Sequence, residues 1–317
     1  MTTKSKKNKL DKMSADTSSC AICNCKGNYK ILLHSTLRDD YSDINMENFS
    51  ARRLPDRVHG TIVRCVKCNL VRTLEVVNPI FLSLLYRRSD FTYKDILENL
   101  TRTYMSVIFK AVKYLEKKKS FLEIGCGNGF LFKDVVSLGF KNVVGVEPSI
   151  NAISFAEEHI RPLIKNTVLK DNIFPPASFD MLAGFQVFDH IQNPNKFLSV
   201  CYDILKTGGI LVLMNHNVNS FSAKILKGKS PIYDIEHPYL YGVDTMRSIL
   251  IKNGFDVVNS YNPGSYFSLR YIARLFPLPK KLKMDIINSR CKFLDITVKT
   301  HPGNLCLIAR KVNKKST

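Results

Sequence analysis

The sequence has no long apolar run and few acidic residues for its length. No stretch of about 18 or more apolar residues occurs among the 317 residues, which excludes a membrane-spanning helix in the sequence-based interpretation. Residues 1–19 are rich in lysine but lead into no apolar stretch, so we expect a disordered basic tail and not a secretory signal. These features together predict a cytoplasmic protein.

The shortage of acid leaves a large positive charge. Only 27 Asp and Glu stand against 47 Lys and Arg, which gives a formal net charge of +20. Such an excess favours anionic partners, namely nucleic acid, sugar nucleotides, phosphorylated lipids or a membrane surface. Part of the charge lies at the two ends of the chain, where it also serves solubility, so charge alone does not name the partner.

Nine cysteines are present, but a disulfide scaffold is not expected in a cytoplasmic chain of this size. Four of them form two CxxC pairs: Cys20 with Cys23, and Cys65 with Cys68. Each CxxC turn places two thiolates on one side of a tight loop, and two such turns complete a tetrahedral shell of four sulfurs that suits Zn²⁺. Four protein ligands leave no open position, so the predicted zinc is structural.

The residue after each CxxC pair supports this interpretation. Asn24 and Asn69 occupy a position that usually needs positive φ, and asparagine adopts it more readily than any other non-glycine residue. Cys25 is a spare thiol that could compete with Cys23. A redox role is disfavoured, because neither pair follows a strand and opens a helix.

A glycine-rich turn follows a predicted strand in the middle of the chain. Residues 121–129, FLEIGCGNG, indicate an apolar strand, a turn, and then a helix. Glycines in the turn allow a ligand to approach the bare backbone. The next predicted strand ends at Glu147, whose carboxylate could accept hydrogen bonds from both hydroxyls of a ribose.

The spacing of the glycines separates two classes of nucleotide site. Dinucleotide sites have GxGxxG, whereas this turn is GxGxG and has Phe130 where the third glycine of the dinucleotide motif would be. Glu123 lies two residues before the first glycine. A carboxylate there disfavours a pyrophosphate but suits the ammonium and sulfonium groups of S-adenosylmethionine.

Strand and helix patterns alternate through the rest of the chain. Further strands are predicted at 178–184, 210–214, 255–258 and 304–310, and helices at 92–118, 194–205 and 244–253. The Gly208–Gly209 pair is expected to stop the second of these helices. The pattern predicts an α/β, Rossmann-like fold with a seven-stranded, mostly parallel sheet and helices on both faces. Ligands of such sheets bind at the carboxyl ends of the strands.

Four segments together resemble the successive motifs of class I S-adenosylmethionine-dependent methyltransferases: FLEIGCGNG, VVGVEP, SFDMLAGFQVFDHIQNP and LKTGGILVLM. The paired CxxC turns are similar to those of a subgroup with an N-terminal zinc module, whose members often modify sugars or belong to polysaccharide-assembly clusters. The resemblance implies S-adenosylmethionine as the cofactor. It also implies, from the methionine end to the adenine end, these binding residues: Glu123, Gly125, Gly127 and Gly129, then Glu147, then Asp171 and Asn172, with Gln186 lining the pocket.

The same resemblance suggests how the chain is divided. We expect a small zinc-ribbon-like module at 20–90 and a methyltransferase domain at 91–317. Within the domain, an insertion at 263–300 separates the last two strands and is expected to cover the active site. Its aromatic and basic residues could also lie on a membrane surface, and a lipid-linked acceptor would reconcile the two interpretations.

Three histidines follow predicted strand ends, His190, His216 and His237. In methyl transfer the protein supplies position, dryness and, for a hydroxyl or carbon acceptor, a base, which is commonly histidine. His216 follows the fifth strand and His237 ends the loop SPIYDIEH, so both are candidates for direct substrate contact and catalysis. His190 is expected to be structural. The alternative for the loop is capping and ion pairing with the lysines at 224–229.

We therefore expect methyl transfer to a small-molecule acceptor, a sugar or a nucleotide-linked or lipid-linked saccharide, and oxygen, nitrogen and carbon all stay open as the acceptor atom. The positive charge raises the alternative of a nucleic-acid methyltransferase. The chain lacks the Asn/Asp-Pro-Pro-Tyr/Phe tetrad, and neither Cys126 nor Cys201 follows a proline as in C5-cytosine enzymes. A second alternative is a non-catalytic cofactor-binding module, which the intact Glu123, Gly129 and Glu147 disfavour.

Overall fold

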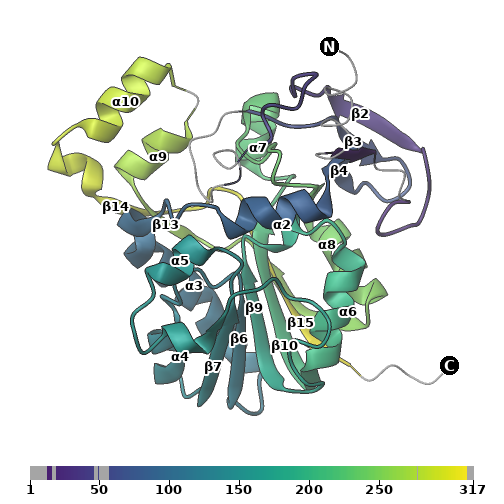
Figure 1. The fold of residues 1–317 in the computed structure, drawn as a ribbon, viewed down its shortest axis with the longest axis vertical. Helices are drawn as coiled ribbons and strands as arrows, with labels where there is room; N and C mark the ends of the chain where they lie inside the picture. Colours follow the sequence, from purple (N-terminus) through teal and green to yellow (C-terminus); the bar gives the residue numbers. More distant parts are fainter. Residues whose placement is uncertain (1–12, 16–18, 46–48, 50–56, 277, 313–317) are drawn as a thin grey trace.

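The computed structural model describes residues 13–15, 19–45, 49, 57–276 and 278–312. A seven-stranded sheet runs through the lower half of the molecule in the order β12-β15-β10-β9-β6-β7-β8 (Figure 1). Its strands are β6 (Ser120–Ile124), β7 (Asn142–Val146), β8 (Ile164–Lys165), β9 (Phe179–Phe185), β10 (Leu205–His216), β12 (Phe255–Tyr261) and β15 (Asn304–Lys311).

Five of these strands, from β8 to β10, are parallel, and β15 lies antiparallel between β10 and β12. The predicted seven-stranded, mostly parallel sheet is therefore confirmed. From β6 the chain proceeds outward through β7 and β8, then returns to place β9 on the other side of β6. The boundary between β6 and β9 is thus the point where the winding direction reverses, and ligands of such sheets bind at this point.

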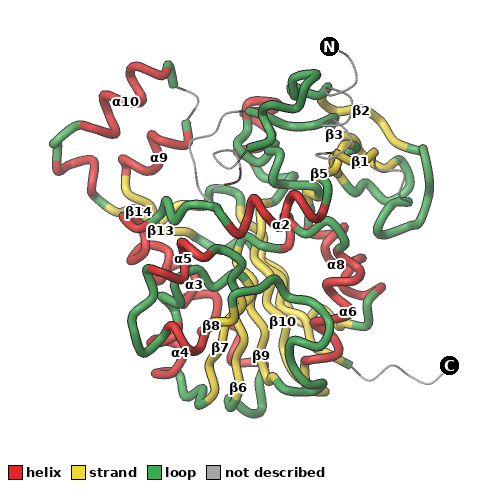
Figure 2. Tube along the Cα trace, viewed as in Figure 1, coloured by secondary structure: helices red, strands yellow, loops and turns green. Residues whose placement is uncertain are grey.

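Helices cover both faces of the sheet (Figure 2). One face carries α3 (Leu97–Ala111), α4 (Phe132–Ser137) and α5 (Ile150–Ser154), and the other carries α6 (Pro194–Ile204) and α8 (Val243–Lys252). Alternate strand residues pack on opposite sides, so Phe121 joins the cluster with α3 and α4, whereas Leu122 joins the cluster with α6 and α8. Burial on both faces explains why the strands are apolar without interruption, as in β9, where all seven residues are buried.

One helix end differs from the expectation. The Gly208–Gly209 pair was expected to stop the helix, but α6 already ends at Ile204 and both glycines lie inside β10. Gly208 has φ +77°, and the pairing of β10 with β9 shifts in register between Leu205 and Ile210. The glycines therefore accommodate an irregularity in a strand that starts earlier than predicted.

A second, four-stranded sheet lies at the upper right of Figure 1. It consists of β2 (Tyr29–Leu33), β3 (Ile62–Cys65), β4 (Val71–Thr73) and β11 (Tyr239–Leu240), in the order β11-β4-β3-β2. Because β11 comes from the second half of the chain, the expected boundary at residue 90 does not separate two independent sheets. Cys20 and Leu70 also belong to the same apolar cluster as Leu122 of the central sheet.

Part of the N-terminal tail is ordered against this region. Strand β1 (Met13–Ala15) pairs antiparallel with β5 (Glu75–Val77), which corrects the expectation of disorder for these three residues. Residues 1–12 and 16–18 of the predicted disordered tail lie outside the described residues.

The remaining helices and strands connect these elements or lie beyond the carboxyl ends of the central strands. They are α2 (Pro79–Arg87), η2 (Lys94–Ile96), η3 (Val112–Tyr114), η4 (Arg161–Leu163), η5 (Phe188–His190), α7 (Phe221–Leu226), η6 (Lys227–Lys229), β13 (Ser265–Ser268), α9 (Leu269–Leu275), α10 (Lys280–Asn288), η7 (Lys292–Asp295) and β14 (Thr297–Thr300). The predicted insertion contains the β13–β14 hairpin and α9 and α10, which project at the upper left of Figure 1. No helix in the described part of the chain is long and apolar enough to cross a membrane.

Candidate functional site

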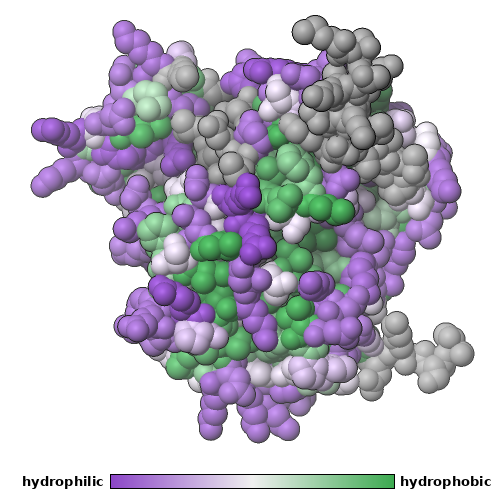
Figure 3. Space-filling model, in the orientation of Figure 1, coloured by the Kyte–Doolittle hydropathy of each residue, from purple (hydrophilic) through white to green (hydrophobic). Residues whose placement is uncertain are grey.

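A cavity of about 640 Å³ lies at the carboxyl ends of β6, β7, β9 and β10. Its position is the winding reversal between β6 and β9, and its volume is typical of small-molecule sites, roughly 300–1,000 Å³. The wall includes residues after α2, Gly125 of the glycine turn, the loop before β11, and the insertion through Phe267, Tyr271 and Thr300. Apolar surface gathers around α2 in Figure 3, where Ile80 and Leu84 are exposed.

The glycine turn meets the cavity through Gly125, whereas Gly127 and Gly129, which were also expected to bind the cofactor, do not line it. Gly125, Gly127 and Gly129 have φ of 72°, 57° and 73°. A Cβ on Gly125 would lie 2.6 Å from Cγ2 of Val187, and one on Gly129 would lie 2.6 Å from Cγ2 of Ile160. The turn therefore needs glycine both for its left-handed backbone and for space.

Glu147 closes this turn from the end of β7. Its Oε2 accepts a hydrogen bond from the Gly127 N–H at 2.9 Å, and its Oε1 accepts one from the Ser149 N–H at 2.8 Å. Burial raises the pKa of Glu147, and these two backbone donors oppose the rise. The carboxylate is thus held in a fixed orientation at the cavity wall, with lone pairs left for a ligand.

Glu123 lies beside Glu147 and lacks such support. It is 2% exposed, and its Oε2 has no hydrogen-bond partner among the described residues. Burial and then the charge of Glu147 raise the pKa of Glu123 well above its ordinary value. A buried carboxyl that lines a cavity without a partner indicates a site for a cationic or hydrogen-donating ligand.

Both residues that the resemblance implied beside adenine lie outside the cavity. Asp171 and Asn172 are exposed and do not line the cavity. Asp171 forms an ion pair with Lys196 at 2.6 Å on the surface, and the backbone at Asn172 has φ 63°. The cavity is lined instead by residues 167–169 of the same loop. Strand β8 has only two residues, and the loop after it meets the cavity a few residues before the positions that the resemblance implied.

Gln186 does line the cavity, at the end of β9 and with φ 57°. Its Nε2 donates a hydrogen bond to Oδ1 of Asn304 at 3.1 Å, and its Oε1 has no partner among the described residues. One polar atom is therefore fixed and the other is available to a ligand.

The three histidines after strand ends meet at the cavity wall. His190, His216 and His237 all line it, and the ring centroids of His190 and His216 lie 4.7 Å and 5.1 Å from that of His237. Tertiary structure thus brings together η5, the end of β10 and the loop before β11. From the sequence we expected a structural role for His190 and did not predict that it lies beside His237 at the cavity wall.

Asp189 lies behind the histidines and is completely buried. Its Oδ2 accepts a hydrogen bond from the backbone N–H of His216 at 3.5 Å, and its Oδ1 lies 3.9 Å from Nε2 of His190. Burial opposes its ionisation, but the charges of His237, His190 and His216 lower the pKa of Asp189. The sequence analysis did not single out Asp189, although its position directly before a histidine was a usable signal.

The protonation of one ring can be assigned from its contacts. Nδ1 of His237 lies 2.9 Å from the carbonyl oxygen of Ile232. A carbonyl only accepts, so Nδ1 carries the hydrogen and Nε2 carries the lone pair of the neutral ring. His237 can therefore offer Nε2 to a proton or to a cation.

A comparison with known protein families identifies one whose model matches this chain. Residues 96–260, more than half of the chain, match the family described as a methyltransferase domain. The chain belongs to this methyltransferase family.

This chain is similar to several relatives that are named O-methyltransferases. It is 31% identical over 112 residues to a ubiquinone biosynthesis O-methyltransferase of Cereibacter sphaeroides, covering 33% of this chain and 45% of the relative. It is 29% identical over 201 residues to the mitochondrial ubiquinone biosynthesis O-methyltransferase of Rattus norvegicus, covering 57% of each. The chain thus spans less than half the length of the first relative.

Among solved structures, an S-adenosylmethionine-dependent methyltransferase from Archaeoglobus fulgidus superposes with a TM-score of 0.49 at 18% identity, covering 70% of this chain and 100% of that chain.

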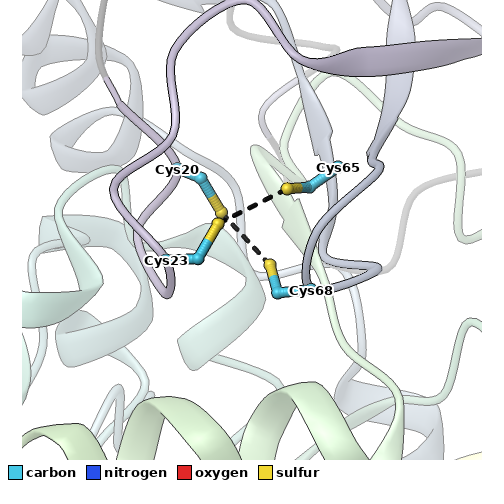
Figure 4. A group of neighbouring side chains, drawn as sticks. All are labelled: Cys20, Cys23, Cys65 and Cys68. Carbon is cyan, nitrogen blue, oxygen red and sulfur yellow. Dashed lines mark hydrogen bonds between the residues drawn. The ribbon is translucent and has the colours of Figure 1, made fainter.

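The four cysteines of the CxxC pairs meet beside the methyltransferase domain (Figure 4). Sγ of Cys20 lies 3.3 Å from that of Cys68, and Sγ of Cys23 lies 3.6 Å from that of Cys65. Sulfurs bound to one tetrahedral Zn²⁺ at about 2.3 Å lie roughly 3.8 Å apart, so the four thiols are near the spacing that zinc requires. The predicted positive φ is confirmed at Asn24 (58°) and Asn69 (62°).

Cys25 is as close to this group as its neighbours are. Its Sγ lies 3.2 Å from Cys23 and 3.3 Å from Cys65. Burial opposes ionisation of Cys65, but hydrogen bonds, the largest of them from the backbone of Cys68, lower its pKa to about 6, whereas hydrogen bonds with Cys23 and Cys65 raise the pKa of Cys25 to about 12. These shifts favour the thiolate form at Cys65 over that at Cys25.

Proposed function

We propose that the protein transfers a methyl group from S-adenosylmethionine to a hydroxyl oxygen of a small-molecule acceptor. The observation that carries this proposal is the pair of buried carboxyls, Glu123 and Glu147, on either side of a GxGxG turn at the carboxyl ends of two parallel strands. Membership of the methyltransferase family supports it. The relatives named O-methyltransferases favour oxygen as the acceptor atom.

The residues around the cavity fit this cofactor. Glu123 would accept a hydrogen bond from its ammonium group, which answers the unpartnered Oε2. Glu147 would accept hydrogen bonds from the ribose hydroxyls while Gly127 and Ser149 keep it oriented. Residues 167–169, rather than Asp171 and Asn172, would lie beside the adenine. S-adenosylmethionine supplies a methyl group on a positively charged sulfur that is already a good leaving group.

We place the acceptor at the histidine side of the cavity. Nε2 of His237 carries a lone pair, because Nδ1 donates to the carbonyl of Ile232. His237 can therefore take the proton of an acceptor hydroxyl, and the buried Asp189 stabilises the positive charge that results. His216 completes the group from the end of β10. The balance is simple: the O–H bond breaks, the O–C bond forms, and the C–S bond breaks with its electron pair left on sulfur.

We further propose that the cysteine module binds one structural Zn²⁺ through Cys20, Cys23, Cys65 and Cys68. Lys252 of α8 donates to the carbonyl of Ala21 at 2.8 Å and to Oδ1 of Asn24 at 3.0 Å, so the first CxxC turn is attached directly to the methyltransferase domain. A metal at this point would fix the four-stranded sheet and, through β11, the loop that carries His237. The similarity of this module to the sugar-modifying subgroup makes sugars, free or carried on a nucleotide or lipid, the acceptors to test first.

Equilibrium binding tests the cofactor assignment. Titration calorimetry should show about one molecule of S-adenosylmethionine or S-adenosylhomocysteine per chain, and no heat from NAD. Binding of NAD, or of neither S-adenosyl compound, would contradict the proposal. Label recovered in RNA from methyl-labelled cofactor would instead support the nucleic-acid alternative.

A further inference from the structure

Asp189, His216 and His237 form a second group of potential metal ligands, separate from the cysteines. We propose that these three residues bind a divalent transition-metal ion whose remaining coordination positions face the cavity. The role that we give to this ion, holding two neighbouring oxygens of the acceptor, rests on the function proposed above. The binding of the ion does not.

The donor atoms are close enough to share an ion. One atom from each of the three side chains lies within 4.8 Å of the other two. Donors that bind one ion at about 2.1 Å are at most roughly 4.2 Å apart, so side-chain adjustments of about half an ångström complete the site. Two imidazoles and one carboxylate are a donor set that zinc, iron and manganese accept, with positions left open for a substrate.

The environment of His237 matches that of a metal-bound histidine. Such a ring usually donates its other N–H to a carbonyl or carboxylate, which fixes the ring and directs the free nitrogen at the metal. Nδ1 of His237 makes this contact with the carbonyl of Ile232 at 2.9 Å. Nε2 is therefore already oriented as a ligand.

The carboxylate supplies an independent indication. Asp189 is fully buried, and its Oδ1 accepts no hydrogen bond from the described residues. Among these residues its ion-pair partner is His190, at 3.9 Å. Asp234 and Glu236 are also buried and line the cavity close by in sequence to His237. A buried carboxylate with one oxygen that accepts no hydrogen bond favours a cation at that oxygen.

The position of the proposed metal site in the cavity determines which class of acceptor the ion can bind. His216 and His237 line the cavity whereas Asp189 lies behind them, so the open positions of the ion point toward the acceptor. An ion so placed can take both oxygens of a vicinal diol or a catechol and lower the pKa of the hydroxyl to be methylated. With the ion bound, Nε2 of His237 is a ligand and no longer the base, so the hydroxyl proton leaves to solvent; the oxygen then attacks the methyl carbon, and the C–S bond breaks with its electron pair left on sulfur. The inferred substrate class is therefore acceptors with two adjacent oxygens.

Cobalt titration of the full chain tests the site directly. With zinc retained in the cysteine module, Co²⁺ should bind at about one further ion per chain and give weak visible bands without thiolate-to-metal charge transfer. His216→Gln and Asp189→Asn should weaken this binding by more than the roughly 10- to 100-fold that follows loss of an outer-shell partner. His59→Gln is the matched control, because His59 is buried and its Nδ1 also contacts a carbonyl, that of Gly60, outside the cavity.

The outcomes separate the proposals. Absence of a second ion in the natural chain, or unchanged Co²⁺ binding in both variants, would overturn the metal site. S-adenosylhomocysteine binding, measured on the same samples, reports on the cofactor proposal and on folding. If Asp189→Asn fails to fold, His216→Gln decides, because His216 is only partly buried. Turnover that persists after the second ion is removed would leave His237 acting as a base without metal, and would also overturn the inferred role of the ion.

Discussion

Replacing Glu123 by glutamine should make the ligand-free protein more stable and its binding of S-adenosylmethionine weaker. The change removes the charge and keeps the shape of a side chain that is 2% exposed and has an unpartnered Oε2. Burial, followed by the charge of Glu147, raises the pKa of Glu123 in the folded protein. The folded state therefore holds the proton more tightly than the unfolded chain, and the free energy of unfolding falls as pH rises above the unfolded carboxyl pKa. Glutamine removes this loss, so the Tm at pH 7 should rise.

The effect on the cofactor has the opposite sign. A hydrogen bond to a charged group contributes about 1.5–3 kcal/mol, so Glu123→Gln should weaken S-adenosylmethionine binding by roughly 10- to 150-fold. Affinity of the natural protein should increase with pH up to the raised pKa of Glu123, because the ammonium group binds the ionised carboxylate. The variant should lose this part of the pH dependence. Calorimetry over a pH series and thermal unfolding of the same samples measure both effects.

Asp180→Asn is the matched control. Asp180 is also a buried acid, but it lies at the start of β9, where Lys206 and Ser120 contact it at 2.9 Å. Burial opposes ionisation, yet these partners lower the pKa of Asp180, so its charge stabilises the fold above the unfolded pKa and this stability is lost as pH falls. The control should have a lower Tm and unchanged cofactor affinity. A Glu123→Gln protein with natural affinity, or with a lowered Tm like the control, would refute the reasoning.

Three further predictions address the rest of the site. Glu147→Ala should weaken cofactor binding by about 1.5–3 kcal/mol, and calorimetry that shows no change would remove the ribose assignment. Metal analysis should find about one tightly held Zn²⁺ in the cysteine module; Cys25→Ser should retain it and Cys23→Ser should lose it, and the reverse pattern would exchange these two ligands. His237→Gln should lower single-turnover methylation by roughly 10²- to 10⁴-fold with little change in cofactor affinity, whereas His59→Gln should leave the rate unchanged; equal rates would exclude His237 from catalysis.

Local sequence signals predicted the features that depend on neighbours in the chain. The strand before Gly125 was predicted because a strand buried on both faces must be apolar throughout. The left-handed turns at Asn24 and Asn69 were predicted from the steric preference of one residue type, and the structure confirms both. The overall sheet followed from the same kind of pattern.

Features that depend on distant contacts were not predictable in this way. Nothing local indicates that Tyr239–Leu240 completes the N-terminal sheet, because its pairing partner β4 lies far away in the chain. Asp171 was assigned by position, but it lies on the surface outside the cavity, paired with Lys196. Asp189 and His237 become neighbours only because η5 packs against the loop before β11. Single residues were found from the sequence, whereas their assembly required the fold.

Transfer of a labelled methyl group tests the central claim most directly. The full chain would be incubated with S-adenosylmethionine carrying a tritiated methyl group and a small-molecule extract, with Glu147→Ala as the control. We predict that label enters a low-mass product on an oxygen next to a second oxygen, identified by mass, and that the control forms far less of it. Label in RNA or protein, or no transfer by a chain that binds the cofactor, would contradict the account.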